Sequence, residues 1–225
     1  MQVQELQTQI ETSYSLPSIH VNRRRSYLVI KRMSDFFISG LALVIMFPIF
    51  LLAAVAIKVE DPRGAIFYKQ LRGGKDGVPF VVYKFRSMYS NADEIKASLM
   101  DQNEMDGPVF KIRNDPRVTK VGRVIRKLSI DEFPQFFNVF QGRLSLVGPR
   151  PLPIAEAEAC NPYQKQRELV KPGITCTWQI SGRNNVSFER WMEMDIEYIA
   201  KQSLWVDFMI LLKTIPAVFS SNGAS

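Results

Sequence analysis

Residues 36–57 read FFISGLALVIMFPIFLLAAVAI, and no charged side chain interrupts them. A helix of about 20 apolar residues is long enough to cross the hydrocarbon core of a bilayer. Helices in the core of a soluble protein rarely run so long without a polar face, which makes a buried core helix the least favoured interpretation. The stretch therefore predicts a helix that enters a membrane.

Both flanks of this stretch are basic. Pro48 also lies near its middle, where it removes a backbone hydrogen bond and kinks the helix. Because Lys and Arg mark the cytoplasmic end of a membrane segment, both ends qualify for the cytoplasm. We therefore favour a re-entrant helix, which dips into one leaflet and returns, over a spanning helix. The flanking basic residues are Arg23–Arg25, Lys31 and Arg32 on one side and Lys58, Arg63, Lys69, Arg72 and Lys75 on the other.

The segments on either side complete the expected domain organisation. Residues 1–30 are polar and rich in Gln and Ser, and their basic residues come too late for a secretory signal. We expect a flexible cytoplasmic tail over residues 1–30 and a re-entrant helix over residues 31–58, kinked at Pro48. Residues 59–225 are expected to form a cytoplasmic domain at the membrane surface.

The sequence after Lys58 has the pattern of a small α+β domain. Residues 65–71 and 79–85 favour β-strands, and Gly73–Gly77 between them favours a hairpin turn. Over residues 204–219 apolar side chains recur at helical spacing, and this helix is predicted either to lie along the membrane interface or to pack into the core. The fold class is therefore α+β, mostly helical, with a small β-hairpin. Further helices are predicted over residues 91–100, 130–140, 163–170 and 187–201.

The composition narrows the chemistry. The formal net charge of +7 indicates anionic partners: nucleic acid, a membrane surface or phosphorylated small molecules. Aromatic residues are not interleaved with basic ones, so nucleic acid is the weakest of the three and is not expected. The one histidine, His20, lies in the polar N-terminal segment, which excludes Ser-His-Asp and Cys-His catalysis and argues against zinc. Cys160 and Cys176 predict free thiols in a reducing compartment.

Asp131 and Glu132 are adjacent and follow a strongly basic segment. Seven Lys and Arg residues lie between Lys111 and Lys127, with Asp115 as the one acid among them. A carboxylate that attacks a phosphate must overcome the repulsion of two anions, which arginine and divalent metal relieve. The pair therefore predicts a site that holds a polyphosphate and attacks it.

A purely structural interpretation of the same residues stays open. Ser129 and Glu132 fit a capping box, with Ser129 as the N-cap and Glu132 reaching back to it. Pro134, however, is best tolerated at the first helical position, so the helix would begin there and leave both acids outside. In either case the carboxylates face a helix N-terminus, which favours their ionised form and attracts phosphate.

Five further cations stand in short turns or near a strand end. A surface charge is the ordinary interpretation of any one of them, but their shared placement favours a phosphate-binding role for the set. Two lie in the segment KFRSM at the end of a predicted strand, and one lies near the end of the basic segment, five residues before Asp131. Of the other two, one is flanked by prolines and one follows Ser181–Gly182. These candidates are Lys84, Arg86, Arg126, Arg150 and Arg183.

Several segments of the chain carry highly specific motifs: DPRVT (115–119), GRVIRKLSIDEFPQ (122–135), SLVGPRP (145–151), KPGIT (171–175) and WQISGRN (178–184). Together they resemble the bacterial sugar transferases, the monotopic phosphoglycosyltransferases that start polysaccharide assembly. The resemblance runs from about Lys31 to the C-terminus. The ending KTIPAV (213–218) is most similar to the short exopolysaccharide-initiating members.

The resemblance implies an undecaprenyl-phosphate hexose-1-phosphate transferase. Such an enzyme transfers hexose 1-phosphate from a UDP-hexose to a polyprenyl phosphate, at the cytoplasmic face of the bacterial inner membrane. This is the first membrane step of exopolysaccharide or related glycan synthesis. By the resemblance, Asp131 is the nucleophile that forms a covalent phosphosugar intermediate and releases UMP, while Glu132 and Asp131 hold Mg²⁺. The phosphates would be gripped by Arg126, Arg150 and Arg183, with Lys84 and Arg86 supporting the site.

The chain departs from the family pattern at two places. Phe47-Pro48 stands where many members have Ser-Pro, so the hydrogen bond that shapes the bend is expected to differ. Cys176-Thr177 stands where many have Gly-Leu or Gly-Trp, so the loop after KPGIT is expected to differ in shape.

Two other functions stay open at this point. One is a membrane-anchored basic adaptor that binds anionic lipid or a partner. The other is a metal-dependent phosphohydrolase that uses Asp131 and Glu132 to activate water. The transferred sugar is also open, with glucose and galactose expected from the resemblance, and so are the exact polyprenyl acceptor and a homodimeric state.

Overall fold

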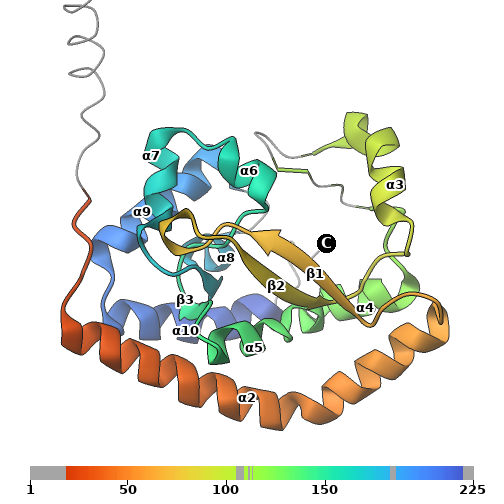
Figure 1. Ribbon diagram of the computed structural model, residues 1–225, viewed down its shortest axis with the longest axis horizontal. Helices are drawn as coiled ribbons and strands as arrows, with labels where there is room; N and C mark the ends of the chain where they lie inside the picture. Colours follow the sequence, from red (N-terminus) through yellow and green to blue (C-terminus); the bar gives the residue numbers. More distant parts are fainter. Residues whose placement is uncertain (1–18, 105–108, 111, 113, 183–185, 220–225) are drawn as a thin grey trace, which may run out of the picture.

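The computed structural model describes residues 19–104, 109–110, 112, 114–182 and 186–219. Helices predominate in this part of the chain, beside one antiparallel and one parallel pair of strands (Figure 1). The predicted fold class is confirmed to that extent: the chain is α+β, mostly helical, with a small β-hairpin and a long apolar N-terminal helix.

The apolar stretch forms helix α2 (Arg25–Glu60). Within the described residues it is the one helix long and apolar enough to cross a membrane, by length and composition. The helix bends near its middle, and the rest of the fold lies on the concave side of the bend (Figure 1). Pro48 lies inside the helix, and its missing N–H accounts for a bend at this point.

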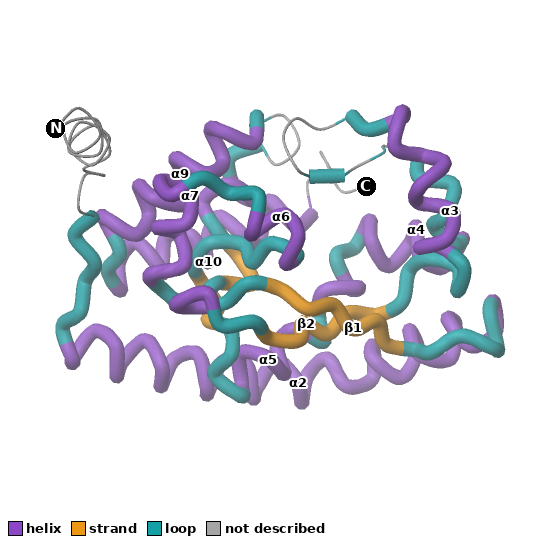
Figure 2. Tube along the Cα trace, turned by 45° about the horizontal axis from the view of Figure 1, so that its top comes forward, coloured by secondary structure: helices purple, strands orange, loops and turns teal. Residues whose placement is uncertain are grey.

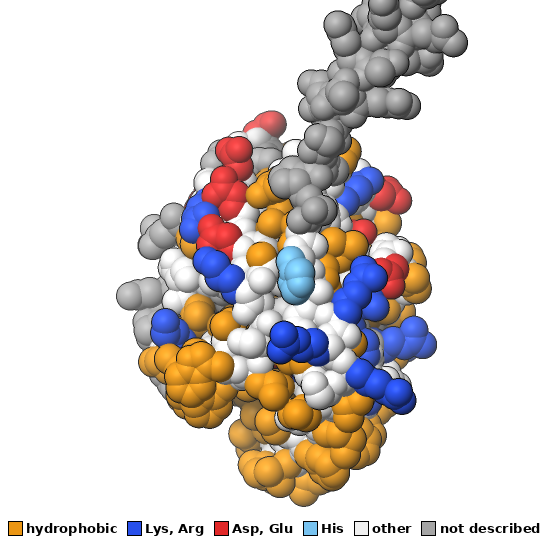
Figure 3. Space-filling view, turned by 90° about the vertical axis from the view of Figure 1, so that its left-hand side faces the viewer, with side chains coloured by type: hydrophobic (Ala, Val, Ile, Leu, Met, Phe, Trp, Pro, Cys, Tyr) orange, Lys and Arg blue, Asp and Glu red, His pale blue; other side chains and the backbone are white. Residues whose placement is uncertain are grey.

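The face of α2 that points away from the rest of the fold is apolar and exposed. Soluble proteins rarely leave a continuous row of large apolar side chains in water. Figure 3 shows hydrophobic side chains gathered along one edge of the molecule, with Lys and Arg side chains beside them. This surface supports contact with a membrane. More than half of the side-chain surface is exposed at Leu41, Val44, Ile45, Phe47, Leu51, Leu52, Val55 and Val59.

The helix is longer than the predicted segment 31–58. It begins at Arg25 and continues to Glu60. The described residues ahead of it, expected to belong to a flexible tail, are packed: Ile19 and Val21 contact the main core cluster. Residues 1–18 of the expected tail lie outside the described residues.

Polar contacts hold both ends of α2 against the rest of the fold. Near its start, Lys31 Nζ donates a hydrogen bond of 3.0 Å to the carbonyl oxygen of Val147. At its end, the Glu60 carboxylate accepts hydrogen bonds of 2.8 Å from the first two backbone N–H groups of α4 (Lys120–Lys127). Since both ends are fastened to one body, the bent shape of α2 is set by these contacts as well as by Pro48.

The predicted hairpin is present. Strands β1 (Phe67–Arg72) and β2 (Phe80–Phe85) pair in antiparallel register, with Phe67 opposite Phe85. The turn between them contains the short helix η1 (Lys75–Gly77), where Asp76 and Gly77 have φ values of 57° and 72°. The hairpin lies over α5 (Gln135–Phe140), and α2 runs beneath (Figure 2). The hairpin thus places the end of β2 near the segment that contains Asp131.

The remaining helices are shorter than predicted, with one exception. Helix α9 (Phe188–Lys201) matches the prediction, and Ser187 caps it by accepting a hydrogen bond from Arg190 N–H. The other three predicted helices each divide into two short pieces. These pieces are α3 (Ala92–Lys96) with η2 (Ala97–Gln102), η3 (Ile130–Glu132) with α5, and α7 (Pro162–Lys165) with η4 (Gln166–Leu169). Two further short helices are α6 (Ile154–Glu158) and α8 (Thr177–Ile180).

A parallel strand pair was not predicted. Strands β3 (Ser145–Val147) and β4 (Gly173–Thr175) pair within the motifs SLVGPRP and KPGIT. β3 is completely buried and joins the main core cluster, which also contains residues of β2, α5, α9 and α10 (Leu204–Phe219). The pair places the loop that follows β3 beside the segment that precedes β4.

Helix α10 packs one face into the core, which is one of the two predicted alternatives. Ile210 and Asp207 are buried against the core. Its opposite face exposes Trp205, Phe208 and Ile215, each at 50% or more of its surface. Helix α10 therefore has one face in the core and one exposed apolar face.

Candidate active site

Asp131 and Glu132 lie in the short helix η3, between α4 and α5. Ser129 precedes them with φ 55° and ψ 18°, a left-handed conformation that is uncommon for a non-glycine residue. Its side chain makes no capping hydrogen bond. The capping-box interpretation is therefore wrong: Ser129 stands at the N-cap position of η3, but its side chain caps no backbone N–H group. The alternative is closer to the structure: α5 begins after Pro134 and leaves both acids outside it.

The Glu132 carboxylate is held by two cations from distant parts of the chain. Lys84 Nζ, at the end of β2, lies 2.7 Å from Glu132 Oε1. Arg150 Nη2, in the loop after β3, lies 2.6 Å from the same oxygen, and its Nη1 donates to Oε2 at 3.4 Å. These side chains are 16–19% exposed, so the contacts are only partly screened by water.

The net pKa shifts of Asp131 and Glu132 are opposite in direction. Burial raises the pKa of Asp131 to about 6, against the opposing effect of Lys84. Burial would also raise the pKa of Glu132, but Arg150 and Lys84 outweigh it and hold that pKa well below its usual range. One carboxylate is thus firmly ionised, while its neighbour is poised to change charge near neutral pH.

Arg126 lies close enough to Asp131 to interact with it electrostatically. Arg126 belongs to α4, and its Nε donates a hydrogen bond of 2.8 Å to Ser87 Oγ. Gly122 permits the close packing behind this contact, since a Cβ there would lie 2.0 Å from the Ser87 carbonyl oxygen. Burial lowers the pKa of Arg126, and Asp131 opposes that shift. The sequence therefore places Arg126 at the carboxylate pair correctly.

Arg86 does not join the cluster. Its guanidinium lies 2.8 Å from the Asp61 carboxylate at the end of α2, and it also donates to Ser90 Oγ. β2 ends at Phe85, so the alternation that would place Lys84 and Arg86 on one face stops before Arg86. Arg183 lies outside the described residues.

Sequence reasoning missed Arg72. It ends β1, is close enough to Arg150 and Glu132 to interact with their charges, and donates to the carbonyl oxygen of Pro151. Burial lowers its pKa to about 10, and the Arg150 charge adds to this effect. Its place opposite Phe80 in the hairpin register could have suggested it, because Phe80 and Lys84 lie on the same face of β2.

The carboxylate pair fits one mode of magnesium binding. Among the described residues no group of three or more His, Cys, Asp or Glu side chains could hold a metal ion. Magnesium, however, is usually bound by one or two carboxylates together with substrate phosphates and water. Asp131 and Glu132 provide those two carboxylates, provided that a ligand brings phosphate oxygens.

The cluster as a whole carries an excess of positive charge. Lys84, Arg126 and Arg150 surround two carboxylates, with Arg72 beside them. Arg150 also lies over the Trp178 ring, with its guanidinium carbon 5.9 Å from the ring centroid. Such a site attracts a phosphorylated ligand and places a carboxylate next to it.

Comparison with known proteins agrees with this chemistry. A family model described as bacterial sugar transferase matches residues 26–221. The chain is 44% identical over 202 residues to the galactosyl transferase CpsE of Streptococcus agalactiae, which covers 88% of the chain and 44% of the relative. It is 41% identical over 198 residues to the exopolysaccharide production protein ExoY of Sinorhizobium fredii, covering 86% and 87%.

The name of a third relative includes undecaprenyl phosphate. The chain is 40% identical over 208 residues to the undecaprenyl-phosphate galactose phosphotransferase of Salmonella typhimurium, covering 89% of the chain and 43% of the relative. The chain thus spans less than half of CpsE and of this phosphotransferase, but most of ExoY. The shared part contains every described residue of the carboxylate cluster.

Proposed function

The chain belongs to the bacterial sugar transferase family, and on that basis we propose that it transfers hexose 1-phosphate from a UDP-hexose to a polyprenyl phosphate. The names of its relatives support a sugar phosphate as the transferred group and undecaprenyl phosphate as the acceptor. The observation that carries the proposal is the pair of adjacent carboxylates, with opposite pKa shifts, inside a cluster of cations.

In the first step, an oxygen of the Asp131 carboxylate attacks the phosphorus atom next to the sugar. The bond from that phosphorus to the bridging oxygen breaks, and UMP leaves with the electron pair. The sugar phosphate is now covalently bound to Asp131 as an acyl phosphate. Arg126, in electrostatic contact with Asp131, is placed to offset the charge repulsion of this attack.

In the second step, an oxygen of the polyprenyl phosphate attacks the same phosphorus. The bond to Asp131 breaks and the carboxylate is restored, so the two displacements balance without a net proton. Splitting the transfer in two allows each substrate phosphate to use the same cations in turn. Arg150 and Lys84, which contact Glu132, also interact electrostatically with Asp131.

Glu132 and Asp131 are the residues that would hold Mg²⁺ together with the diphosphate of the donor. A bound Mg²⁺ supplies charge neutralisation on the diphosphate and on the departing phosphate. Glu132 stays ionised well below neutral pH, which suits a metal ligand.

We further propose that α2 is re-entrant and that the domain lies on the cytoplasmic face of the inner membrane. The bend at Pro48, the anchored ends of α2 and the basic flanks support this topology. The exposed faces of α2 and α10 would then meet lipid, where a polyprenyl phosphate presents its headgroup.

The proposal is tested with purified protein in detergent, a panel of UDP-sugars, polyprenyl phosphate and Mg²⁺, with UMP as the measured product. We expect UMP from one or a few UDP-hexoses and a lipid-linked sugar phosphate of matching amount. Free sugar phosphate formed without lipid acceptor would identify a phosphohydrolase instead. No turnover, with lipid binding that weakens smoothly with salt and is indifferent to Asp131→Asn, would identify a basic adaptor.

A further inference from the structure

Arg150 belongs to a loop whose backbone is fixed at every position from 149 to 152. The prolines on both sides of Arg150 already restrict the backbone. Four consecutive carbonyl oxygens then accept hydrogen bonds from four different donors. Pro149 O accepts from Gly173 N–H, Arg150 O from the Arg167 guanidinium, Pro151 O from the Arg72 guanidinium and Leu152 O from Gly73 N–H.

The bond to Arg150 O depends on a buried ion pair behind the loop. Arg167, in η4, is 6% exposed, and Asp195, in α9, is 1% exposed. Arg167 donates to Asp195 Oδ2 through Nε at 3.1 Å and through Nη2, and the same Nη2 donates to the carbonyl oxygen of Arg150. Asp195 therefore orients the guanidinium that holds the loop.

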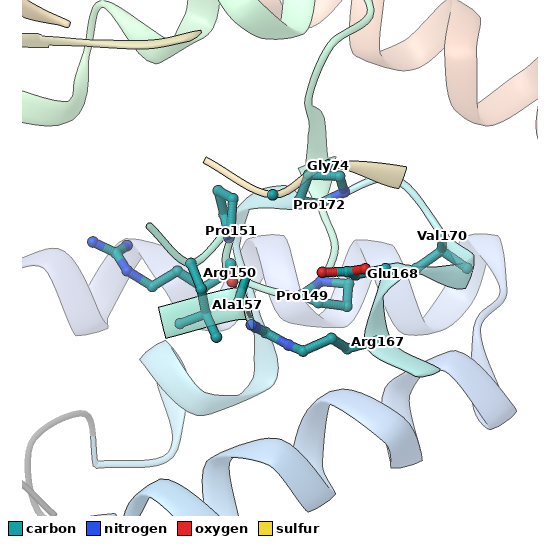
Figure 4. Close-up of a pocket in the computed structure, with 11 residues that line it drawn as sticks. Gly74, Pro149, Arg150, Pro151, Ala157, Arg167, Glu168, Val170 and Pro172 are labelled. Atoms are coloured by element: carbon teal, nitrogen blue, oxygen red, sulfur yellow. Dashed lines mark hydrogen bonds between the residues drawn. The ribbon is translucent and has the colours of Figure 1, made fainter. Parts of the chain in front are cut away.

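Arg167 and the carboxylate pair lie on different sides of this loop. Figure 4 shows the side chain of Arg150 pointing away from the small pocket behind the loop, while Arg167 points toward the loop from the pocket side. Arg167 contacts Asp195, the Arg150 backbone and the Trp191 ring. Arg167 thus acts on the site through the backbone of Arg150.

We propose that Arg167 is a positioning residue: held by Asp195, it fixes the Arg150 backbone so that the Arg150 guanidinium meets Glu132. This inference rests on the proposed function for its catalytic consequence. A displaced Arg150 would lose its short contact with Glu132 and its grip on a phosphate. A misplacement of about 1 Å costs up to roughly 100-fold in rate, so a loss of about 10- to 100-fold is expected.

The test replaces the buried pair by apolar residues, Arg167→Met with Asp195→Leu, because removing one partner alone would leave a buried charge. The matched control is Arg190→Met with Glu197→Leu, which removes an ion pair of 2.7 Å between half-exposed side chains of α9. Each pair of changes is made in the wild-type chain and in Arg150→Ala. Sugar-phosphate transfer and the thermal unfolding midpoint are measured for all proteins.

We expect the buried-pair variant to lose about 10- to 100-fold in kcat/KM in the wild-type background and little further in Arg150→Ala, because the proposed effect acts through Arg150. The Arg150→Ala change should likewise lower the unfolding midpoint less in the buried-pair variant than in wild type. The control pair of changes should leave both kcat/KM and the unfolding midpoint unchanged, in the wild-type chain and in Arg150→Ala. Equal losses in both backgrounds would overturn the inference and leave Arg167 a general stabilising residue.

The unfolding measurements separate this inference from the proposed function. If the wild-type protein releases no UMP from any UDP-sugar, the proposed function fails, while a non-additive unfolding midpoint still supports the positioning of Arg150 by Arg167. Additive unfolding midpoints in an active enzyme, together with additive rate losses, overturn the inference and leave the proposed function intact.

Discussion

Asp131 and Glu132 are neighbours in sequence, yet the pKa of Asp131 is raised to about 6 and that of Glu132 lies well below its usual range. Burial dominates at Asp131, whereas at Glu132 Arg150 and Lys84 outweigh burial. Two titratable groups with separated pKa values commonly have different roles at a reacting centre. The difference supports Asp131 as the group that reacts and Glu132 as the group that organises cations.

The pH dependence of turnover should follow Asp131. A nucleophilic carboxylate must be ionised, so kcat/KM should fall as the pH drops through about 6. We expect a nearly constant rate from pH 7 to 8 and roughly a tenfold loss about one unit below the pKa. Initial rates of UMP release across this range measure the effect. A flat profile down to pH 5 would contradict the assignment.

Asp131→Asn should abolish transfer yet stabilise the folded protein at high pH. A carboxyl whose pKa in the folded protein exceeds its ordinary value of 3.8 destabilises the fold when ionised. That penalty is absent below pH 3.8, grows as the pH rises toward 6 and is complete above it. We expect the unfolding free energy at pH 8 to rise by about 1–3 kcal/mol in the variant, and the difference to shrink toward pH 4. Denaturant melts at both pH values provide the measurement.

Glu132→Gln should destabilise the protein, because it leaves Lys84 and Arg150 beside a neutral amide. Breaking a largely buried ion pair costs about 3–5 kcal/mol, and partial exposure reduces this to roughly 2–4 kcal/mol. Glu193→Gln is the matched control, since its partner Arg190 is about half exposed. If Glu132→Gln and Glu193→Gln lower the free energy of unfolding by similar amounts, the Glu132 contacts stabilise the protein no more than a surface ion pair does.

Lys84→Ala and Arg86→Ala should differ although the two residues are nearly adjacent. Lys84 contacts Glu132, so its loss should lower kcat/KM by about 100-fold or more. Arg86 contacts Asp61 at the end of α2, so its loss should lower the unfolding midpoint and leave kcat/KM within about tenfold of wild type. Parallel kinetics and thermal melts of the two variants test this. A loss of kcat/KM of more than about tenfold in Arg86→Ala would show that Arg86 acts in the site.

The two ends of α2 should be reachable from the same side of the membrane. Single cysteines at the exposed positions Arg24 and Arg63 are informative because the native Cys160 and Cys176 are buried. An impermeant thiol reagent should label both positions only after the cells are opened. Labelling of one position in intact cells would show a spanning helix.

The sequence predicted features that depend on local patterns. The β-favouring runs on either side of the glycine-rich turn predicted the hairpin, and the helix-favouring sequence over residues 187–201 predicted α9. The cation cluster was predicted in part: Lys84 and Arg150 meet Glu132, and Arg126 lies near Asp131.

Features that depend on distant contacts were not predictable in this way. Ser129 fits a capping box by spacing, but α4 forces it into a left-handed conformation. Arg86 turns to Asp61 because β2 ends one residue earlier. The three-residue strands β3 and β4 are too short to give a periodic signal, and their pairing across the chain fixes the loop that carries Arg150.

The most direct test of the proposed mechanism is the mass of the intact protein after incubation with its UDP-sugar and Mg²⁺, without a lipid acceptor. We expect a rapid mass increase of one hexose phosphate with release of one UMP per protein. Peptide mapping should place the adduct on Asp131, and added polyprenyl phosphate should remove it. A protein that transfers sugar phosphate to lipid with no such adduct, or whose Asp131→Asn variant still transfers it, would contradict the covalent mechanism.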